Sequence, residues 1–288
     1  HLFSSAASDV YKRQTNIDID EDGDTFVIGM EGSFQVSGFG RVYKKINNSW
    51  SEMPSATNQF NGAAQGNGFG SRGMKISDDG LTIIGGGQQN SIGYVFPFEY
   101  YDKGLGAGLE WRRRGDYVDY GNIYRSSIGE TLNDISISGN GDVMGYAYGE
   151  KAILHNNVNV NDYTYNSNPI FETSNPNGGD TSAISINFDG SYIALSHQYG
   201  AVRIYTSNTR FGEYLQIGNT LSGCTGVSGV SLFGTRIALS NNGQTILISD
   251  IYGDDPRNNT TSNDDVGVAC VFEYKNNCLL YTSPSPRD

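Results

Sequence analysis

The sequence predicts an all-β protein, and three observations carry this prediction. The composition is rich in turn and strand formers, with 38 glycines and 19 tyrosines among 288 residues, which favours strands and turns over helices. Apolar residues alternate along short segments such as residues 184–196, as they do in a strand with one buried face. Finally, one type of segment, two short strands around an Asp-Gly or Asn-Gly turn, recurs five times.

The recurring segment is aligned by its turn glycine. Each copy reads apolar, any, apolar, small polar, any, Asp or Asn, Gly, and a second strand follows. The aligned glycines are Gly23, Gly80, Gly141, Gly190 and Gly243, at spacings of 57, 61, 49 and 53 residues. Asp-Gly and Asn-Gly are strong hairpin signals, because both central residues of a two-residue type I′ turn need positive φ. We therefore expect five tight hairpins.

Each hairpin is followed by signals for two more strands. A third strand of the form Gly-x-Val-x-Val-Tyr is expected at residues 38–45, 93–100, 200–207 and 267–274, with a degenerate copy at 149–156. A fourth strand is marked by Trp50, Trp111 and Tyr214. Four antiparallel strands at this period are typical of a propeller blade, and stacked neighbours bury the faces that one sheet leaves open. The sequence thus predicts an all-β propeller of about five four-stranded antiparallel blades.

The two ends of the chain are set aside from the fold. Residues 1–14 and 278–288 resemble in-frame translations of adapter sequences used in short-read DNA sequencing, so we interpret them as artefacts. The expected blades cover about 15–57, 68–118, 127–168, 180–219 and 230–277. On this interpretation residues 15–277 are an internal piece of a longer protein. The last blade then stops after its third strand, and the ring is open or incomplete.

The charge and the hydropathy of the chain each disfavour one class of partner. The formal net charge is −12, and it becomes −13 without the two ends, which hold three basic and two acidic residues. A surface this negative repels phosphate groups, so we expect no nucleic-acid partner. No run of 18 apolar residues occurs in 15–277, so no membrane insertion is expected within this piece.

Two cysteines, Cys224 and Cys270, lie outside the set-aside ends. They are too few for a disulfide scaffold and have no metal-binding spacing. Two alternatives stay open: a single bridge between them, or two free thiols in partly buried positions.

The repeats resemble FG-GAP repeats, the blade type of integrin-alpha propellers, and especially those of bacterial and marine surface proteins. Residues 233–249 are similar to the Phe-Gly-x-Ser-Val-x-Leu-Ser-x-Asp-Gly strand pair of that family. Residues 37–50 are similar to its Ser-Gly-x-Val-x-Val-Tyr segment, and residues 214–223 to its bridge between blades. The resemblance implies a propeller fold, an extracellular or cell-surface location and a binding role.

A first candidate metal site lies in residues 18–24. Asp18, Asp20 and Asp22, followed by Gly23, imitate the Asp-x-Asp-x-Asp-Gly start of a calcium loop. FG-GAP calcium loops carry a further Asp near the ninth position, where this chain has Phe26. The repeat offers an alternative, because Asp20 occupies a position that is Ser or Asn in the other copies. Ca²⁺ and a plain polar hairpin turn are the two hypotheses.

A second candidate metal site lies between the second and third strands of the last repeat. Its carboxylates are Asp250, Asp254, Asp255, Asp264 and Asp265. They could gather around Ca²⁺, or they could belong to a solvated polar loop.

Two other patterns are interpreted as structural. Residues 68–73 match G-x-G-x-x-G, but a strand follows instead of the helix that a dinucleotide site needs. Tyr94, Phe96, Phe98 and Tyr100 alternate along one strand. Their spacing favours packing between blades over stacking on a glycan.

The sequence predicts no catalytic residue. His155 and His197 are the histidines of residues 15–277, and neither belongs to a recognised catalytic motif. His197 is expected in the loop that follows a second strand.

The expected working surface is the face opposite the Asp/Asn-Gly turns. Four longer segments reach it: residues 58–68, 172–180, 222–231 and 250–267. Length variation on one face is typical of a binding surface in repeat proteins. We therefore predict a non-enzymatic binding or adhesion module with a protein or glycan ligand. The alternatives are a fragment of a propeller enzyme, a hydrolase or lyase with catalytic residues outside this piece, and a structural spacer. The oligomeric state is left open.

Overall fold

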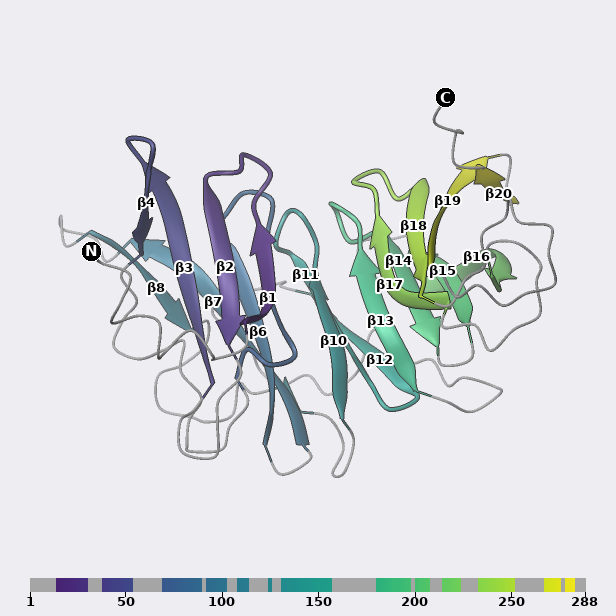
Figure 1. Ribbon diagram of the computed structural model, residues 1–288, viewed down its shortest axis with the longest axis horizontal. Coiled ribbons are helices and arrows are strands. Elements are labelled where there is room, and N and C mark those ends of the chain that lie inside the picture. The colour runs from purple at the N-terminus through teal and green to yellow at the C-terminus, as the bar shows by residue number, and fades with distance from the viewer. Residues whose placement is uncertain are drawn as a thin grey trace. The chain divides into compact units, whose positions relative to one another are not determined.

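The computed structural model describes most of the repeats and none of the longer segments between them. The described residues are 14–30, 38–53, 69–89, 92–102, 108–113, 124–125, 131–156, 180–197, 200–207, 214–223, 233–251, 267–275 and 278–282. Every regular element in them is a β-strand, labelled β1 to β20 in Figure 1. In this part of the chain no helix is long and apolar enough to span a bilayer.

The strands belong to two compact units, which are described separately. Unit 1 is residues 1–137 with 157–166, and unit 2 is residues 138–156 with 167–288. The third repeat is divided, because its first strand lies in unit 1 and its second and third strands lie in unit 2.

Unit 1 holds two antiparallel sheets in simple up-and-down order. The first consists of β1 (Gln14–Ile19), β2 (Thr25–Met30), β3 (Phe39–Ile46) and β4 (Ser49–Glu52). The second consists of β5 (Gly73–Ile76), β6 (Thr82–Gln89), β7 (Ile92–Asp102) and β8 (Leu109–Arg113), with β9 (Tyr124–Arg125) paired to β7. β10 (Leu132–Ile137) packs against the second sheet.

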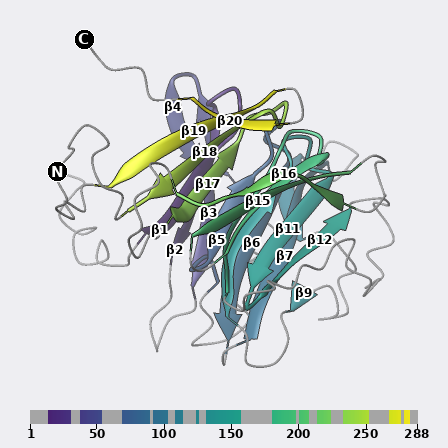
Figure 2. The same ribbon diagram turned by 90° about the vertical axis from the view of Figure 1, so that its right-hand side faces the viewer.

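Unit 2 holds a strand pair and two complete sheets. The pair is β11 (Val143–Tyr148) and β12 (Lys151–Asn156). The first sheet consists of β13 (Thr181–Ile186), β14 (Tyr192–His197), β15 (Ala201–Ser207) and β16 (Tyr214–Leu221), green in Figure 2. The second consists of β17 (Phe233–Leu239), β18 (Thr245–Asp250), β19 (Val268–Lys275) and β20 (Cys278–Thr282).

The predicted all-β fold class and its four-stranded antiparallel blades are confirmed. The fourth strands fall where the sequence expects them, at Trp50, Trp111 and Tyr214. The expectation that the last blade stops after its third strand is wrong, because β20 pairs with β19. A free strand edge offers unpaired backbone groups to any extended segment that follows. Whether residues 278–288 are an artefact, and whether the ring is open, stay predictions.

The core of unit 1 is aromatic. Phe69 is fully buried and lies with its ring centroid 5.9 Å from Phe96 and 6.0 Å from Phe98. The interpretation of the alternating aromatics of β7 as packing residues is confirmed, since Tyr94 joins this cluster and Tyr100 packs against it. The residues around G-x-G-x-x-G therefore build the core.

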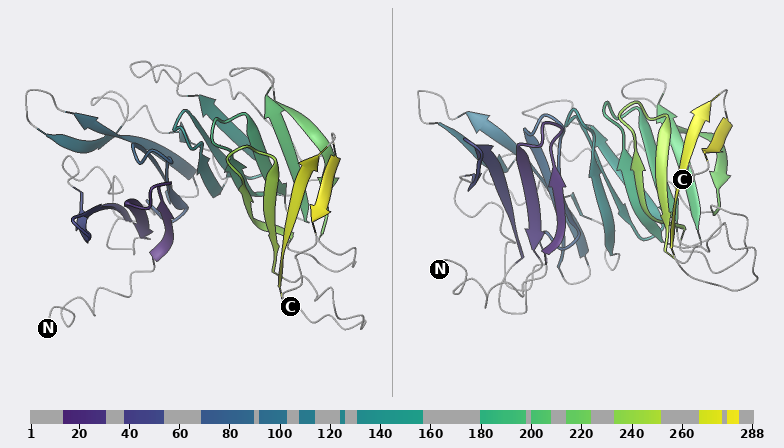
Figure 3. Two further views of the ribbon diagram at one scale, coloured as in Figure 1. Left: turned by 90° about the horizontal axis from the view of Figure 1, so that it is seen from above. Right: turned by 45° about the horizontal axis from the view of Figure 1, so that its top comes forward.

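The cores of unit 2 lie on the two faces of its first sheet. Ile193 and Leu195 of β14 join the cluster on the side of β11 and β12. Ala194, between them in sequence, joins the cluster on the side of β17 and β18, as side chains of a strand alternate between faces. Figure 3 shows the β17–β20 sheet stacked on the β13–β16 sheet. Cys270 is buried there and disulfide-bonded; Cys224 lies outside the described residues.

The hairpin turns differ from the expected type. Each is a four-residue loop in which only the glycine has positive φ, for example 68° at Gly23 and 69° at Gly243. The residue three before the glycine closes the loop, as in the bond from Asp20 N to Thr25 O at 3.0 Å. Two adjacent residues with positive φ occur instead at Asn47 and Asn48, between β3 and β4. The prediction of two-residue type I′ turns at the Asp/Asn-Gly pairs is therefore wrong.

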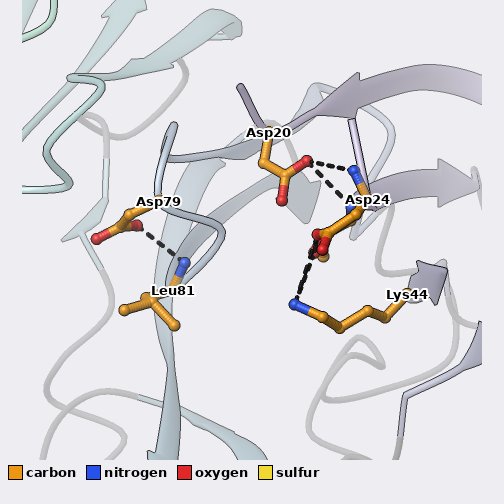
Figure 4. Close-up of polar contacts among 6 residues, drawn as sticks. Asp20, Asp24, Lys44, Asp79 and Leu81 are labelled. Atoms are coloured by element: carbon orange, nitrogen blue, oxygen red, sulfur yellow. Dashed lines mark hydrogen bonds and ion pairs between the residues drawn. The ribbon is translucent and has the colours of Figure 1, made fainter. Parts of the chain in front are cut away.

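Polar side chains inside the loops explain this geometry. In the second repeat the Asp79 Oδ1 accepts the backbone N–H of Leu81 at 2.9 Å (Figure 4). In the first repeat Asp20 Oδ1 accepts the N–H groups of Asp24 and Thr25, both at 3.0 Å. The side chain at the Asp20 position makes the bond to the residue five further on in all five repeats. These bonds hold the residue before the glycine in a conformation with negative φ.

Neighbouring sheets within each unit are joined by backbone and side-chain hydrogen bonds. In unit 1 the turn residue Glu21 donates its N–H to the carbonyl of Asp78 at 3.1 Å, and in unit 2 Phe188 donates to Asn241 at 3.3 Å. The first strands are also linked: Ile76 N donates to Asp18 Oδ2 at 3.0 Å. The equivalent bond in unit 2 joins Leu239 N to Ser185 Oγ at 3.0 Å. Adjacent blades are thus held in a fixed register.

Candidate functional site

The candidate site lies where the second strands of unit 2 end, opposite the Asp/Asn-Gly turns. One aligned position lies at or near the end of the second strand in each repeat. It is occupied by Met30, Gly87, Tyr148, His197 and Asp250. Only the last two are acidic or basic, and both are buried. Ionisable groups are seldom placed in a buried strand end without a partner or a task.

His197 is held by its own sheet and by burial. It is the last residue of β14, and 1% of it is exposed. Its Nδ1 lies 3.4 Å from the hydroxyl of Thr181, its cross-strand partner on β13. Burial, helped by the charge of Arg203, lowers the pKa of His197 from 6.5 to about 4. The imidazole is therefore neutral at pH 7.

The second ring nitrogen of His197 is unsatisfied. Its Nε2 is buried and has no hydrogen-bond partner among the described residues. A neutral imidazole has one N–H donor and one acceptor nitrogen. When Nδ1–H donates to Thr181 Oγ1, Nε2 carries the lone pair and can accept a proton.

The backbone around His197 is irregular. The pairing of β13 with β14 shifts register between Thr181 and Ala183, next to the pair that Thr181 forms with His197. The N–H of Thr181 leaves this ladder and donates to Gly149 O at 2.6 Å. β-bulges of this kind re-aim side chains and are common beside functional sites.

Arg203 lies on the same face of the sheet. It is two residues beyond Ala201, the cross-strand partner of His197 on β15, so the two side chains are diagonal neighbours. Its Nε donates to Thr220 Oγ1 at 3.3 Å. The register of β15 with β16 shifts between Val202 and Ile204, which brings Thr220 beside Arg203.

Ser196 and His197 do not form a nucleophile–base pair. They are adjacent in one strand, so their side chains point to opposite faces. Ser196 faces β17, where a Cβ built on Gly234 would lie 2.8 Å from the Ser196 Cβ. The Ser196 hydroxyl is buried and has no hydrogen-bond partner in the described part of the chain. A Ser-His-Asp triad is therefore not built by Ser196, His197 and Asp250.

The first predicted calcium ligands are used for other contacts. Asp18 binds Ile76 N and lies 3.7 Å from Lys75 Nζ. Asp20 is buried and accepts two backbone N–H groups, whereas Asp22 is exposed. Within the described residues no three His, Cys, Asp or Glu side chains gather as a metal site. Calcium at these residues stays a prediction that no contact supports.

The second predicted calcium site cannot be assembled from the described residues. Asp250 is buried at the end of β18. Its four expected co-ligands, Asp254, Asp255, Asp264 and Asp265, lie outside the described residues. Three of the four segments expected to form the working surface also lie outside them apart from residues at their ends, and the fourth, residues 58–68, does so entirely.

His155 is a second histidine of unit 2, half-buried and away from the strand end. Its ring stacks on Tyr146 with centroids 5.7 Å apart, and its Nε2 lies 3.4 Å from the Tyr146 hydroxyl. Burial lowers its pKa from 6.5 to about 4.

The sequence missed Thr181, His197 and Arg203 as a group. His197 was expected in a loop, but it is a buried strand residue. Its partner Thr181 is 16 residues away across the hairpin, and no motif spans that separation. The usable signal was the repeat alignment, which has apolar or small residues at the His197 position in the first three copies.

The two histidines make stability depend on pH. Both pKa values are lower in the folded state, about 4 against an ordinary 6.5, so the unfolded chain binds protons more readily between these values. Stability is then fully present above pH 6.5 and falls as the pH drops toward 4, by on the order of 3 kcal/mol for each histidine. Urea unfolding at pH 7, 6 and 5 measures this slope.

The matched variant for that experiment is His155→Gln combined with His197→Gln. It should flatten the dependence of the free energy of unfolding on pH between pH 7 and pH 5. Unfolding caused by protonation of carboxylates below pH 5 should remain. An unchanged slope would show that neither histidine is held in its neutral form by the folded chain.

Four-stranded antiparallel sheets that stack through their first strands define the β-propeller class of fold. Two solved structures share it. One is a periplasmic gluconolactonase of Pseudomonas aeruginosa, with 14% identity and a TM-score of 0.55 over 93% of this chain and 70% of that one. The other is a protein from Lactobacillus plantarum, with 11% identity and a TM-score of 0.59 over 94% of this chain and 70% of that one. No protein-family model matches the sequence, and no curated protein is a significant match.

These comparisons correct the predicted function. The main prediction, a non-enzymatic binding or adhesion module, is contradicted, because the structural relative with a stated activity is a propeller enzyme. The finding favours the alternative, a fragment of a propeller enzyme. At this level of identity the likeness establishes the fold alone.

Proposed function

We propose that this chain is part of a propeller hydrolase that opens a lactone ring, with His197 as the base that activates water. The observation that carries the proposal is the neutral, buried imidazole of His197, whose Nε2 has no hydrogen-bond partner among the described residues. The likeness to the periplasmic gluconolactonase supports the class of reaction. The FG-GAP resemblance is kept as a proposal about the type of blade only.

In the proposed reaction His197 Nε2 accepts a proton from a water molecule while the water oxygen adds to the lactone carbonyl carbon. The bond from that carbon to the ring oxygen then breaks, and the ring oxygen receives the proton and becomes a hydroxyl. The product is a hydroxy acid, which loses a proton to solvent and becomes a carboxylate at neutral pH. Thr181 orients the imidazole through Nδ1. A base positioned in this way accelerates a reaction by about 10²–10⁴-fold.

The test is hydrolysis of glucono-1,5-lactone by the full chain, followed by the loss of lactone with the spontaneous rate subtracted. His197→Gln should lower kcat by about 10²–10⁴-fold. His155→Gln is the matched control, since it removes the other histidine of unit 2 with a lowered pKa, and it should retain kcat. As the pH is lowered, the kcat of the unaltered chain should fall when His197 becomes protonated. The apparent pKa of this fall should be about 4, in place of the ordinary 6.5 of histidine.

Two results would count against the proposal. A rate no higher than spontaneous hydrolysis for the unaltered chain would refute lactone hydrolysis. Full kcat in a folded His197→Gln variant would refute the role of His197.

A further inference from the structure

The starting point is the pairing of the basic side chains. Acidic residues outnumber basic ones by 31 to 19, so a cation is readily paired in this chain. The described cations that form ion pairs with carboxylates are Arg41, Lys44, Lys75, Arg112 and Lys275. Arg203 is half-buried and has no carboxylate partner among the described residues. A partly buried guanidinium without a counter-ion favours binding of an anion.

The contacts of Arg203 leave most of its donors available. Its Nε donates to Thr220 Oγ1, and it also hydrogen-bonds the Tyr205 hydroxyl. A guanidinium has five N–H donors in a planar fork that matches a carboxylate. The amide of Gln216 lies in the same cluster, with Nε2 3.5 Å from Thr220 Oγ1, and Gln216 is exposed.

We infer that the guanidinium of Arg203, with Thr220 and Gln216 beside it, binds the carboxylate of a sugar acid at the end of unit 2 that holds His197. This inference rests on the proposed function, because a sugar acid is the product that ring opening releases. Arg203 and His197 are diagonal neighbours on one face. A carboxylate formed at His197 therefore lies within reach of the long Arg203 side chain. Thr220 and Gln216 supply hydrogen-bonding groups suited to the hydroxyls of the sugar.

The experiment is calorimetric titration of the full chain with sodium gluconate, with glucose as the neutral probe. The unaltered chain should bind gluconate and not glucose. Arg203→Met should weaken gluconate binding at least tenfold, and Arg203→Lys should give an intermediate affinity, because it keeps the charge without the planar fork. Arg236→Met is the matched control: Arg236 is an exposed arginine of unit 2 whose guanidinium donates to the carbonyl of Thr235. It should leave the affinity unchanged.

Equal affinity in Arg203→Met and in the unaltered chain would overturn the inference, as would binding of glucose as tightly as gluconate or the absence of gluconate binding. Far-ultraviolet circular dichroism shows whether Arg203→Met is folded, and if it is not, the Arg203→Lys affinity decides. Lactone hydrolysis without Arg203-dependent gluconate binding would refute this inference and leave the proposed function standing. Arg203-dependent gluconate binding without lactone hydrolysis would support this inference and refute the proposed function.

Discussion

Replacing Phe69 with Ala should lower the free energy of unfolding by about 3–5 kcal/mol. Phe69 is 0% exposed and fills the space above two glycines. A Cβ built on Gly85 would lie 2.5 Å from Phe69 Cζ, and one on Gly40 would lie 3.6 Å from Phe69 Cε1. Because the surrounding strands are held by their ladders, they cannot collapse into the cavity that Ala leaves. Urea unfolding followed by tryptophan fluorescence, to which Trp111 in the same cluster contributes, measures the loss.

The control for this prediction is Leu81→Ala. Leu81 is a large apolar residue of unit 1, but 49% of it is exposed, so its removal should change stability by no more than about 0.5 kcal/mol. Phe69→Leu should give an intermediate loss. If Phe69→Ala and Leu81→Ala cost the same, Phe69 is not at the centre of the unit 1 core.

Replacing Gly243 with Ala should cost about 3 kcal/mol, from two separate causes. Gly243 has φ of 69°, a conformation that costs a residue with a Cβ about 1–2 kcal/mol. The added Cβ would also lie 2.3 Å from Cγ of the Tyr192 ring in the neighbouring sheet, and overpacking of this kind costs about 1–3 kcal/mol. Urea unfolding measures the sum.

Gly223→Ala separates the two causes. Gly223 has φ of 86°, and a Cβ built on it meets no atom of the described residues within 4 Å. Its replacement should therefore cost only the backbone term of about 1–2 kcal/mol. A loss in Gly243→Ala no greater than in Gly223→Ala would mean that the Tyr192 ring moves aside freely, and that the turns do not set the distance between sheets.

The fold was predictable because its signals are local. The aligned glycines located all five hairpins, and Trp50, Trp111 and Tyr214 located the fourth strands. The turn type was not predictable from the Asp/Asn-Gly pair, because it depends on the side chain two residues earlier. The side chains of Asp20 and its equivalents accept the backbone N–H of the residue five positions further on. In a two-residue turn that N–H would bond to the opposite strand instead. A last strand at Cys278–Thr282 was missed because pairing with a free edge needs little specific sequence.

The candidate site was less predictable than the fold. The neutral state of His197 depends on burial against a neighbouring strand pair. The residues next to His197 in the sequence do not indicate that burial. Arg203 stands out only when its partial burial is known together with its lack of a carboxylate partner among the described residues. The predicted adhesion role failed for a related reason: it followed from the type of repeat, and repeat type does not determine the chemistry that a fold supports.

The bonds between successive hairpin loops have an evolutionary consequence. They join main-chain atoms, so the bonds themselves do not depend on the side chain at that position: it is Glu21 and Asp78 in one pair, and Phe188 and Asn241 in another. Mutations can accumulate there without altering the spacing of the blades. Sequence similarity between related chains would then be lost long before the similarity of their folds. Homologues of this chain are better sought by comparing shapes than by aligning residues.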